Sequence, residues 1–266
     1  MKTRLDKLLV DRGITASRVR AQALILAGKV LVNEQKIEKA GASVECDSAL
    51  RLLGEDLRYV SRGGLKLEKA LAHWQIDLDG KVCLDVGAST GGFTDCMLQH
   101  GAARVIAVDT GYGQMDFRLR EDPRVRLLEK TNARYLTQNE LGEPVDFITM
   151  DVSFISATLV LPAVIQVSWG VSRGQPERHA PPDWTAETPV TSRKIVVLVK
   201  PQFEVGREQV GKGGIVRDES AQRAAVAKVE TALRKLGCSR TEWIDSPILG
   251  MEGNREFLLY GELRSV

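Results

Sequence analysis

Five short apolar runs recur between residues 82 and 200, and segments with helical spacing separate them. The runs cover residues 82–88, 104–110, 125–130, 145–152 and 194–200. Strands that are apolar along their whole length need cover on both faces, as in a parallel sheet with crossover helices. We therefore expect an α/β fold with a doubly wound, mainly parallel sheet that binds ligands at the carboxyl ends of its strands.

Helices are expected at residues 64–74, from Ser156 onward and at 221–236, and the chain should end in a two-stranded hairpin. Residues 168–192 break this pattern, because they contain four prolines and few apolar residues. We predict an exposed insertion there. Trp169 could touch RNA, although a tolerated surface insertion is the simpler interpretation.

The N-terminal segment differs from the rest of the chain in charge. Residues 1–31 contain seven Lys or Arg and two Asp, whereas the whole chain has 37 basic and 35 acidic residues. Apolar spacing predicts two helices in this segment, the second capped by Ser17 or Thr15. The apolar face of the second helix should consist of Val19, Ala23, Leu24 and Leu26. The charge suggests a small domain that meets phosphate, with an ordinary solvated helix face as the alternative.

Short strands at residues 30–32 and 49–53, with a hairpin-like turn toward Ile37, complete a small α/β module. The segments RLDKLLVDRG and SRVRAQALILAGKVLVN resemble the RNA-binding domain named after ribosomal protein S-four. The resemblance implies an RNA-binding domain over residues 1–57, a linker at 58–62 and a second domain at 63–266. The RNA-binding residues that it implies are Arg4, Lys7, Arg18 and Arg20.

A glycine-rich turn, DVGASTGGF, follows the first apolar run of the second domain. Its residues Asp85, Gly87, Ser89, Gly91 and Gly92 lie where a strand passes into a helix, so its backbone can approach a ligand closely. The spacing is not the GxGxxG of dinucleotide enzymes.

Two further residues extend this candidate nucleoside site. Asp109 ends the second strand, where a carboxylate can accept hydrogen bonds from ribose hydroxyls, and Asn132 follows the third strand, where it could contact adenine. The set fits S-adenosylmethionine best. A plain tight turn, and an ordinary turn asparagine at 132, remain the alternatives.

Four more polar residues should meet at the same edge of the sheet. Lys66 precedes the first strand, Asp151 and Lys200 end the fourth and fifth strands, and Glu256 opens the last one. Taken singly, each could be a structural salt bridge. Their order and local sequence resemble the Lys-Asp-Lys-Glu tetrad of FtsJ-type ribose 2′-O-methyltransferases.

The segments SRGGLKL, MDVSFIS, LVKPQFE and GNREF extend the resemblance to nearly the whole chain, which is similar to the TlyA family, also called hemolysins. The resemblance implies a Rossmann-like class I methyltransferase fold with an N-terminal RNA-binding domain. It also implies S-adenosylmethionine-dependent methylation of cytidine 2′-hydroxyls in ribosomal RNA of the small or large subunit, or both. No apolar run is long enough to span a membrane, the scattered cysteines favour the reducing cytoplasm, and no stable protein partner is implied.

The chemistry suits these residue types. A ribose hydroxyl is a weak nucleophile, so the enzyme must orient it and accept its proton. We expect Lys200 to be the base, Lys66 to tune charge and hold the ribose or its phosphate, and Asp151 and Glu256 to orient the lysines and the hydroxyl. A second lysine, the sulfonium charge and partial burial would favour the neutral amine.

Other chemistries fit less well. No Asn/Asp-Pro-Pro-aromatic segment for adenine methylation follows the fourth strand, and Cys83 and Cys96 lie inside predicted elements rather than at a strand end. The four scattered cysteines suggest neither a zinc site nor disulfides. A catalytically silent ribosome assembly factor is the main alternative. A membrane-lysing protein is disfavoured, because no strongly apolar or amphipathic membrane segment is evident.

Overall fold

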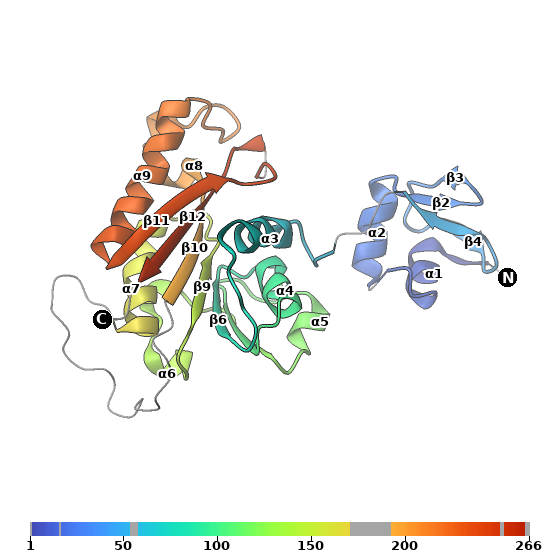
Figure 1. The fold of residues 1–266 in the computed structure, drawn as a ribbon. Coiled ribbons are helices and arrows are strands. Elements are labelled where there is room, and N and C mark those ends of the chain that lie inside the picture. Colours follow the sequence, from blue (N-terminus) through green and yellow to red (C-terminus); the bar gives the residue numbers. More distant parts are fainter. Residues whose placement is uncertain (1, 16, 54–57, 171–192, 251–252, 264–266) are drawn as a thin grey trace. The chain divides into compact units, whose positions relative to one another are not determined.

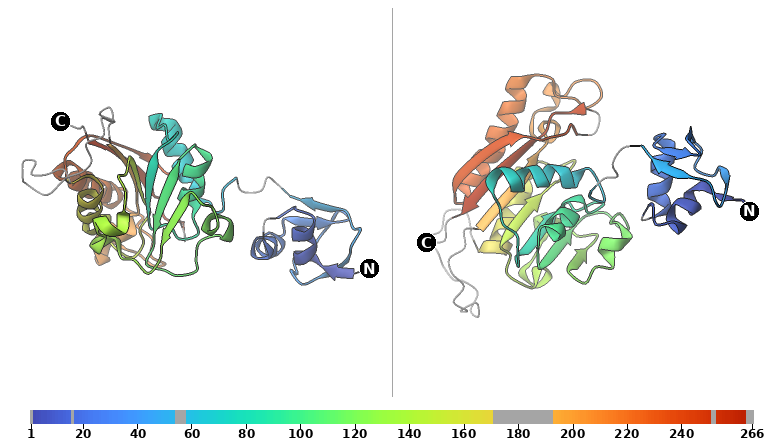
Figure 2. Two further views of the ribbon diagram at one scale, coloured as in Figure 1. Left: turned by 90° about the horizontal axis from the view of Figure 1, so that it is seen from below. Right: turned by 45° about the vertical axis from the view of Figure 1, so that its right-hand side comes forward.

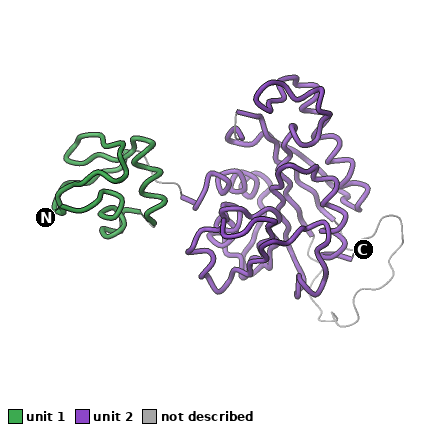
Figure 3. The backbone as a smooth tube through the Cα atoms, turned by 180° about the vertical axis from the view of Figure 1, so that it is seen from behind, with its two compact units in different colours: residues 1–57 green, residues 58–266 purple. Residues whose placement is uncertain are grey.

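The computed structural model of the chain describes residues 2–15, 17–53, 58–170, 193–250 and 253–263. The chain divides after Leu57 into two compact units, which Figure 3 shows in different colours. Each unit has its own hydrophobic core. Within these described ranges, no helix is long and apolar enough to cross a membrane.

In the first unit, two helices pack on short strands (Figure 1). Its elements are β1 (Lys2–Arg4), α1 (Leu5–Asp11), α2 (Arg18–Leu26), β2 (Val30–Val32), β3 (Gln35–Lys36), β4 (Ser43–Glu45) and β5 (Leu50–Leu52). β1 pairs with β4, and β2 lies between β3 and β5, all antiparallel. The sequence predicts neither β1 nor β4, because neither contains an apolar run.

Ser17 caps α2, since its hydroxyl accepts a hydrogen bond from the Arg20 N–H. The buried residues of α2 are Ala21, Leu24 and Ile25. Val19, Ala23 and Leu26 are exposed instead, so the predicted apolar face is wrong at these three positions. Three consecutive apolar residues in so short a helix do not define which face packs inward.

The second unit is built on a seven-stranded sheet in the order β11-β12-β10-β9-β6-β7-β8. The strands are β6 (Val82–Val86), β7 (Arg104–Val108), β8 (Val125–Leu128), β9 (Phe147–Met150), β10 (Arg193–Val199), β11 (Cys238–Asp245) and β12 (Phe257–Leu263). β6 to β10 are parallel, and β12 runs antiparallel between β10 and β11. The predicted mainly parallel sheet with a terminal hairpin is confirmed.

Helices cover both faces of this sheet (Figures 1 and 2). α3 (Gly63–Trp74) and α4 (Gly92–Gln99) share one core, and α7 (Ala157–Trp169) and α9 (Glu219–Lys235) share the other. From Ile195 to Val199, successive residues of β10 enter opposite cores, which explains why this part of the strand is continuously apolar. The shorter helical turns are α5 (Phe117–Arg120), η1 (Ala133–Tyr135), α6 (Gln138–Leu141), α8 (Pro201–Glu204) and η2 (Arg207–Gln209).

Two predicted boundaries need correction. The expected exposed insertion from residue 168 begins too early, because Ser168 and Trp169 are buried in α7 and the Trp169 indole N–H donates to the Val145 carbonyl. Trp169 therefore cannot contact RNA, and residues 171–192 lie outside the described parts. The predicted linker at 58–62 packs with the second unit: the Tyr59 ring is buried there, and the Val60 N–H donates to the Asp95 carboxylate.

The Asp85 carboxyl ties together three elements below the glycine-rich turn. It is fully buried on β6 and accepts hydrogen bonds from the hydroxyls of Thr94 on α4, at 2.6 Å, and Thr149 on β9, at 3.0 Å. Burial raises the pKa of Asp85 to about 6, because hydroxyls compensate only part of the lost hydration of the charged form.

We predict that Asp85→Asn changes the pH dependence of stability. The pKa of Asp85 in the folded state, about 6, exceeds the unfolded-state value of about 3.9, so the wild-type free energy of unfolding falls as pH rises through this window. The asparagine side chain does not titrate, so the variant does not lose this stability as pH rises. Relative to wild type, its free energy of unfolding should rise by on the order of 3 kcal/mol between pH 3 and pH 7.

Urea unfolding of both proteins, followed by tryptophan fluorescence, measures this difference, since all four tryptophans lie in the second unit. Comparing the two proteins at each pH cancels the other titrating groups. A difference that does not vary with pH would contradict the prediction.

Candidate active site

The predicted catalytic residues meet at the carboxyl edge of the parallel strands. Asp151 follows β9 and Lys200 follows β10, its neighbour. β12 is antiparallel to β10 with Phe257 opposite Val199, so Glu256 enters the same edge beside Lys200. Strand register alone thus brings together three residues that are far apart in the chain.

The four side chains form two ion pairs. The Lys200 Nζ lies 2.5 Å from Asp151 Oδ1 and donates a hydrogen bond to the Ser153 hydroxyl at 2.8 Å. The Lys66 Nζ, on α3, donates to Glu256 Oε2 at 2.5 Å. Both lysine side chains are 11% exposed and Glu256 is nearly buried. Each lysine is thereby held at a fixed position yet remains reachable from the edge.

The segment before Glu256 is fixed by a residue that sequence reasoning missed. Asn254 is buried, its side-chain oxygen accepts from the Val216 N–H, and its side-chain nitrogen donates to the Gly214 carbonyl. These bonds fasten the glycine-rich loop at 205–217 to the strand that carries Glu256. An asparagine two residues before a predicted catalytic glutamate is the sequence signal that could have identified it.

The glycine-rich turn lies directly beside this tetrad. Gly87 has a φ of +86°, and a Cβ there would come within 2.4 Å of the Asp151 carbonyl oxygen, so only glycine fits. Ser89 and Gly91 also have positive φ, and Gly91 is the residue before α4. Gly92 opens α4 against the start of α3, where a Cβ would lie 3.0 Å from the Gly64 nitrogen. This close helix contact sets the position of Lys66.

Asp109 lies at the next strand end with its carboxylate fixed by the backbone. One oxygen accepts from the Ser89 N–H at 2.8 Å and the other from the Gly111 N–H at 2.6 Å. The carboxylate is therefore oriented at the rim of the turn, with acceptor capacity left for a ribose hydroxyl. Asp85, in contrast, lies below the turn and supports it rather than presenting a carboxylate to a ligand.

Asn132 lies in the turn between β8 and η1 and has a local partner. Its side-chain oxygen accepts from the Arg134 N–H and caps η1, and the residue is exposed. Its amide group is thus oriented by the turn. Over the described residues, no group of three or more His, Cys, Asp or Glu could hold a metal ion.

An exposed aromatic residue beside Lys200 was not among the predicted site residues. Phe154 is 90% exposed with a φ of +63°, an unusual conformation for a bulky side chain, and its ring rests on Phe203 at a centroid distance of 5.2 Å. Such backbone conformations cluster at functional sites. The sequence pattern MDVSF gave the position of Phe154 but not its exposure.

The predicted RNA-binding residues lie in the first unit. Arg4 and Arg18 both donate to Asp6, Lys7 pairs with Asp11 one helical turn away, and Arg20 lies on α2. The side chains of Arg4, Lys7 and Arg18 are each more than half exposed. The structure thus gathers Arg4 and Arg18 on one carboxylate.

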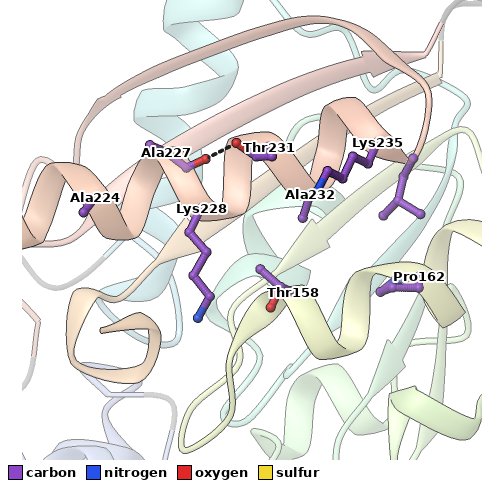
Figure 4. A pocket seen from close by; sticks show the side chains of 9 residues that line it. Thr158, Pro162, Ala224, Ala227, Lys228, Thr231, Ala232 and Lys235 are labelled. Atoms are coloured by element: carbon purple, nitrogen blue, oxygen red, sulfur yellow. Dashed lines mark hydrogen bonds between the residues drawn. The ribbon is translucent and has the colours of Figure 1, made fainter. Parts of the chain in front are cut away.

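A groove of about 490 Å³ runs between α7 and α9 (Figure 4). Thr158 and Pro162 line one side, and alanines with Lys228 and Lys235 line the other. It includes no residue of the tetrad, the glycine turn or Asp109, so the candidate active site lies elsewhere.

The FtsJ-like methyltransferase family model matches residues 59–263, and the S4 domain model matches residues 3–45. YqxC of Bacillus subtilis is 43% identical over 97% of this chain and 85% of its own length. A Mycobacterium tuberculosis protein named 16S/23S rRNA (cytidine-2′-O)-methyltransferase TlyA is 42% identical over 97% of this chain and 89% of its own.

A solved structure from Streptococcus thermophilus, 40% identical, superimposes with a TM-score of 0.69 over 99% of this chain and 89% of that one. Hemolysin A of Brachyspira hyodysenteriae is 36% identical over 97% of this chain and 98% of its own length. The chain therefore belongs to the FtsJ-like methyltransferase family, in the group that combines this fold with an S4 domain and includes TlyA.

Proposed function

We propose that the protein transfers a methyl group from S-adenosylmethionine to cytidine 2′-hydroxyls of ribosomal RNA, in the small or large subunit or both. The observation that carries the proposal is the pair of Lys–carboxylate contacts, Lys66–Glu256 and Lys200–Asp151, next to the glycine-rich turn. The name of the M. tuberculosis relative supports the choice of substrate. Such a protein would act in the cytoplasm.

The glycine turn and Asp109 fit the proposed cofactor. Gly87, Ser89, Gly91 and Gly92 would approach it with their backbone, and the Asp109 carboxylate would accept hydrogen bonds from its ribose. Asn132 would lie near the adenine. Bound S-adenosylmethionine supplies an electrophilic methyl group on a sulfonium.

The tetrad would prepare the hydroxyl for attack. Lys200 would accept the hydroxyl proton at Nζ, and Asp151 and Ser153 would hold that amine in place. Lys66, fixed by Glu256, would hold the ribose or its phosphate.

Two surfaces would hold the RNA. Phe154 offers an exposed ring beside Lys200 on which the target base could stack, and stacking of this kind tolerates any base. The first unit, residues 1–57, would bind structured RNA through Arg4, Lys7, Arg18 and Arg20, while residues 63–266 perform the transfer.

We predict that Lys200→Ala abolishes transfer without loss of cofactor binding. General base catalysis contributes about 100-fold or more, so the rate should fall by at least ~100-fold, while the Kd for S-adenosylmethionine stays within about 3-fold of wild type. The assay measures labelled methyl transfer to purified small and large subunits that lack the modification, followed by nuclease mapping for alkali-resistant linkages.

Lys235 is an exposed residue of α9, so Lys235→Ala makes the same charge change away from the candidate site and should retain full activity. Wild type that binds the cofactor but labels neither subunit would favour the catalytically silent assembly factor. Near-normal transfer by Lys200→Ala would show that another group accepts the proton.

We predict that Asp109→Asn weakens cofactor binding. The amide group of asparagine cannot accept from both backbone N–H groups and a ribose hydroxyl at once, so the Kd for S-adenosylmethionine should rise by about 10- to 100-fold. Isothermal titration calorimetry measures this, with Asp122→Asn, a carboxylate paired with Arg124 at the surface, as the matched control. An unchanged Kd for Asp109→Asn would remove Asp109 from the cofactor site.

A further inference from the structure

The first unit contains a carboxylate that is buried but surrounded by cations. Asp6 on α1 is 0% exposed. Its two oxygens accept hydrogen bonds from Arg4 Nε at 3.0 Å and Nη2 at 2.9 Å, from Arg18 Nη2 at 3.1 Å, and from Gln22 Nε2 at 2.8 Å. The hydrogen bond from Arg4 holds the pKa of Asp6 well below its usual range, so the carboxylate is ionised at neutral pH.

The two arginines come from different elements but converge on this one group. Arg4 ends β1 and Arg18 opens α2. The Arg4 guanidinium also lies against Gly41, where a Cβ would come within 3.3 Å of Nη1. Both side chains remain 54% exposed, so each guanidinium has one side on Asp6 and another toward solvent.

Such an arrangement is suited to binding one phosphate. Two guanidiniums and one carboxylate leave a net positive charge, and a guanidinium fork can pair with phosphate oxygens in a bidentate manner. Arginine side chains that are already ordered lose less conformational freedom when they bind. Without the carboxylate between them, two neighbouring guanidiniums would repel each other and separate.

We propose that Asp6 is a positioning residue for RNA binding, whose buried carboxylate fixes Arg4 and Arg18 as a clamp for a single backbone phosphate. The proposal deepens the proposed function and rests on its assignment of this unit to RNA. It extends beyond the basic residues themselves, because it gives an acidic residue a favourable part in binding a polyanion.

The sign of the Asp6→Asn effect separates this proposal from simple charge attraction. The substitution removes a negative charge, so charge attraction alone predicts tighter RNA binding. Loss of the clamp predicts weaker binding instead. Asp11→Asn makes the same charge change on the same helix, at a carboxylate about half exposed and paired with Lys7, and is the matched control.

The experiment measures the affinity of the full chain for ribosomal subunits and for a 20-base-pair RNA duplex across a range of KCl concentrations. We expect Asp6→Asn to bind both at least ~10-fold more weakly than wild type. The slope of log affinity against log salt should become shallower by about one for each phosphate that the variant no longer neutralises. Asp11→Asn should bind as tightly as wild type or more tightly.

Two further comparisons separate positioning from a purely structural role. In an Arg4→Gln/Arg18→Gln background, Asp6→Asn should cause no further loss of affinity, because the clamp is already absent. Arg18→Lys keeps the charge and leaves Asp6 paired with Arg4, yet it should weaken binding several-fold because lysine lacks the fork. If circular dichroism shows that Asp6→Asn is unfolded, the RNA affinity of Arg18→Lys tests the proposal instead.

If folded Asp6→Asn binds RNA as tightly as wild type or more tightly, the proposal is overturned. It is also overturned if Asp6→Asn lowers the RNA affinity of the Arg4→Gln/Arg18→Gln variant as much as it lowers that of wild type. With Asp6→Asn unfolded, unchanged binding by Arg18→Lys overturns it. Wild type that binds the duplex but not the subunits, with Asp6→Asn weaker on the duplex, supports the clamp and contradicts the ribosomal substrate. Wild type that binds neither RNA overturns the clamp.

Discussion

The parallel pairing of β6, β9 and β10 is the constraint on which the candidate site depends. It brings the carboxyl ends of three strands to one edge, where the backbone of the turn after β6 comes against Asp151. This contact is possible only because residue 87 has no Cβ. The antiparallel addition of β12 then places Glu256 at the same edge. The glycine turn and three of the four tetrad residues are therefore products of the same strand register, whereas Lys66 comes from helix α3.

Three buried carboxylates each connect separate elements of the structure, and the hydrogen-bond partners of each one determine its role. Asp85 has hydroxyl partners, so burial raises its pKa and it acts as a tie between a helix and two strands. Asp6 has two arginines, so its pKa falls and it orders cations. Glu204 accepts from the Ser156 hydroxyl and the Ala157 N–H, which anchors the start of α7 to the turn after Lys200. The same chemical group thus supports the core of the second unit, the arginine pair of the first unit and the candidate active site.

Several features of the fold and the site were predictable because they depend on local sequence. Apolar runs, helix caps such as Ser17 and strand-terminal polar residues are read from a few neighbouring positions. Features that depend on contacts between residues far apart in the sequence were not predictable. Val19 and Leu26 fit an apolar helix face but are exposed, whereas Trp169 lies beside a proline-rich segment but is buried, with its indole N–H bonded to the Val145 carbonyl. The exposure of Phe154 depends on a backbone conformation that its neighbours in sequence do not signal.

The sequence by itself determined the doubly wound sheet, the basic N-terminal unit, and the order in which the glycine turn and the four tetrad residues occur. It did so because strand and helix periodicity, and the polar residues that end each run, are local properties. Only the tertiary structure decided which lysine faces which carboxylate, since Lys66 on α3 and Glu256 before β12 are 190 residues apart and meet only when the helix packs on the sheet. It also decided that Asp85 supports the turn and that Asp6 holds two arginines, because burial and charge compensation depend on contacts between distant elements.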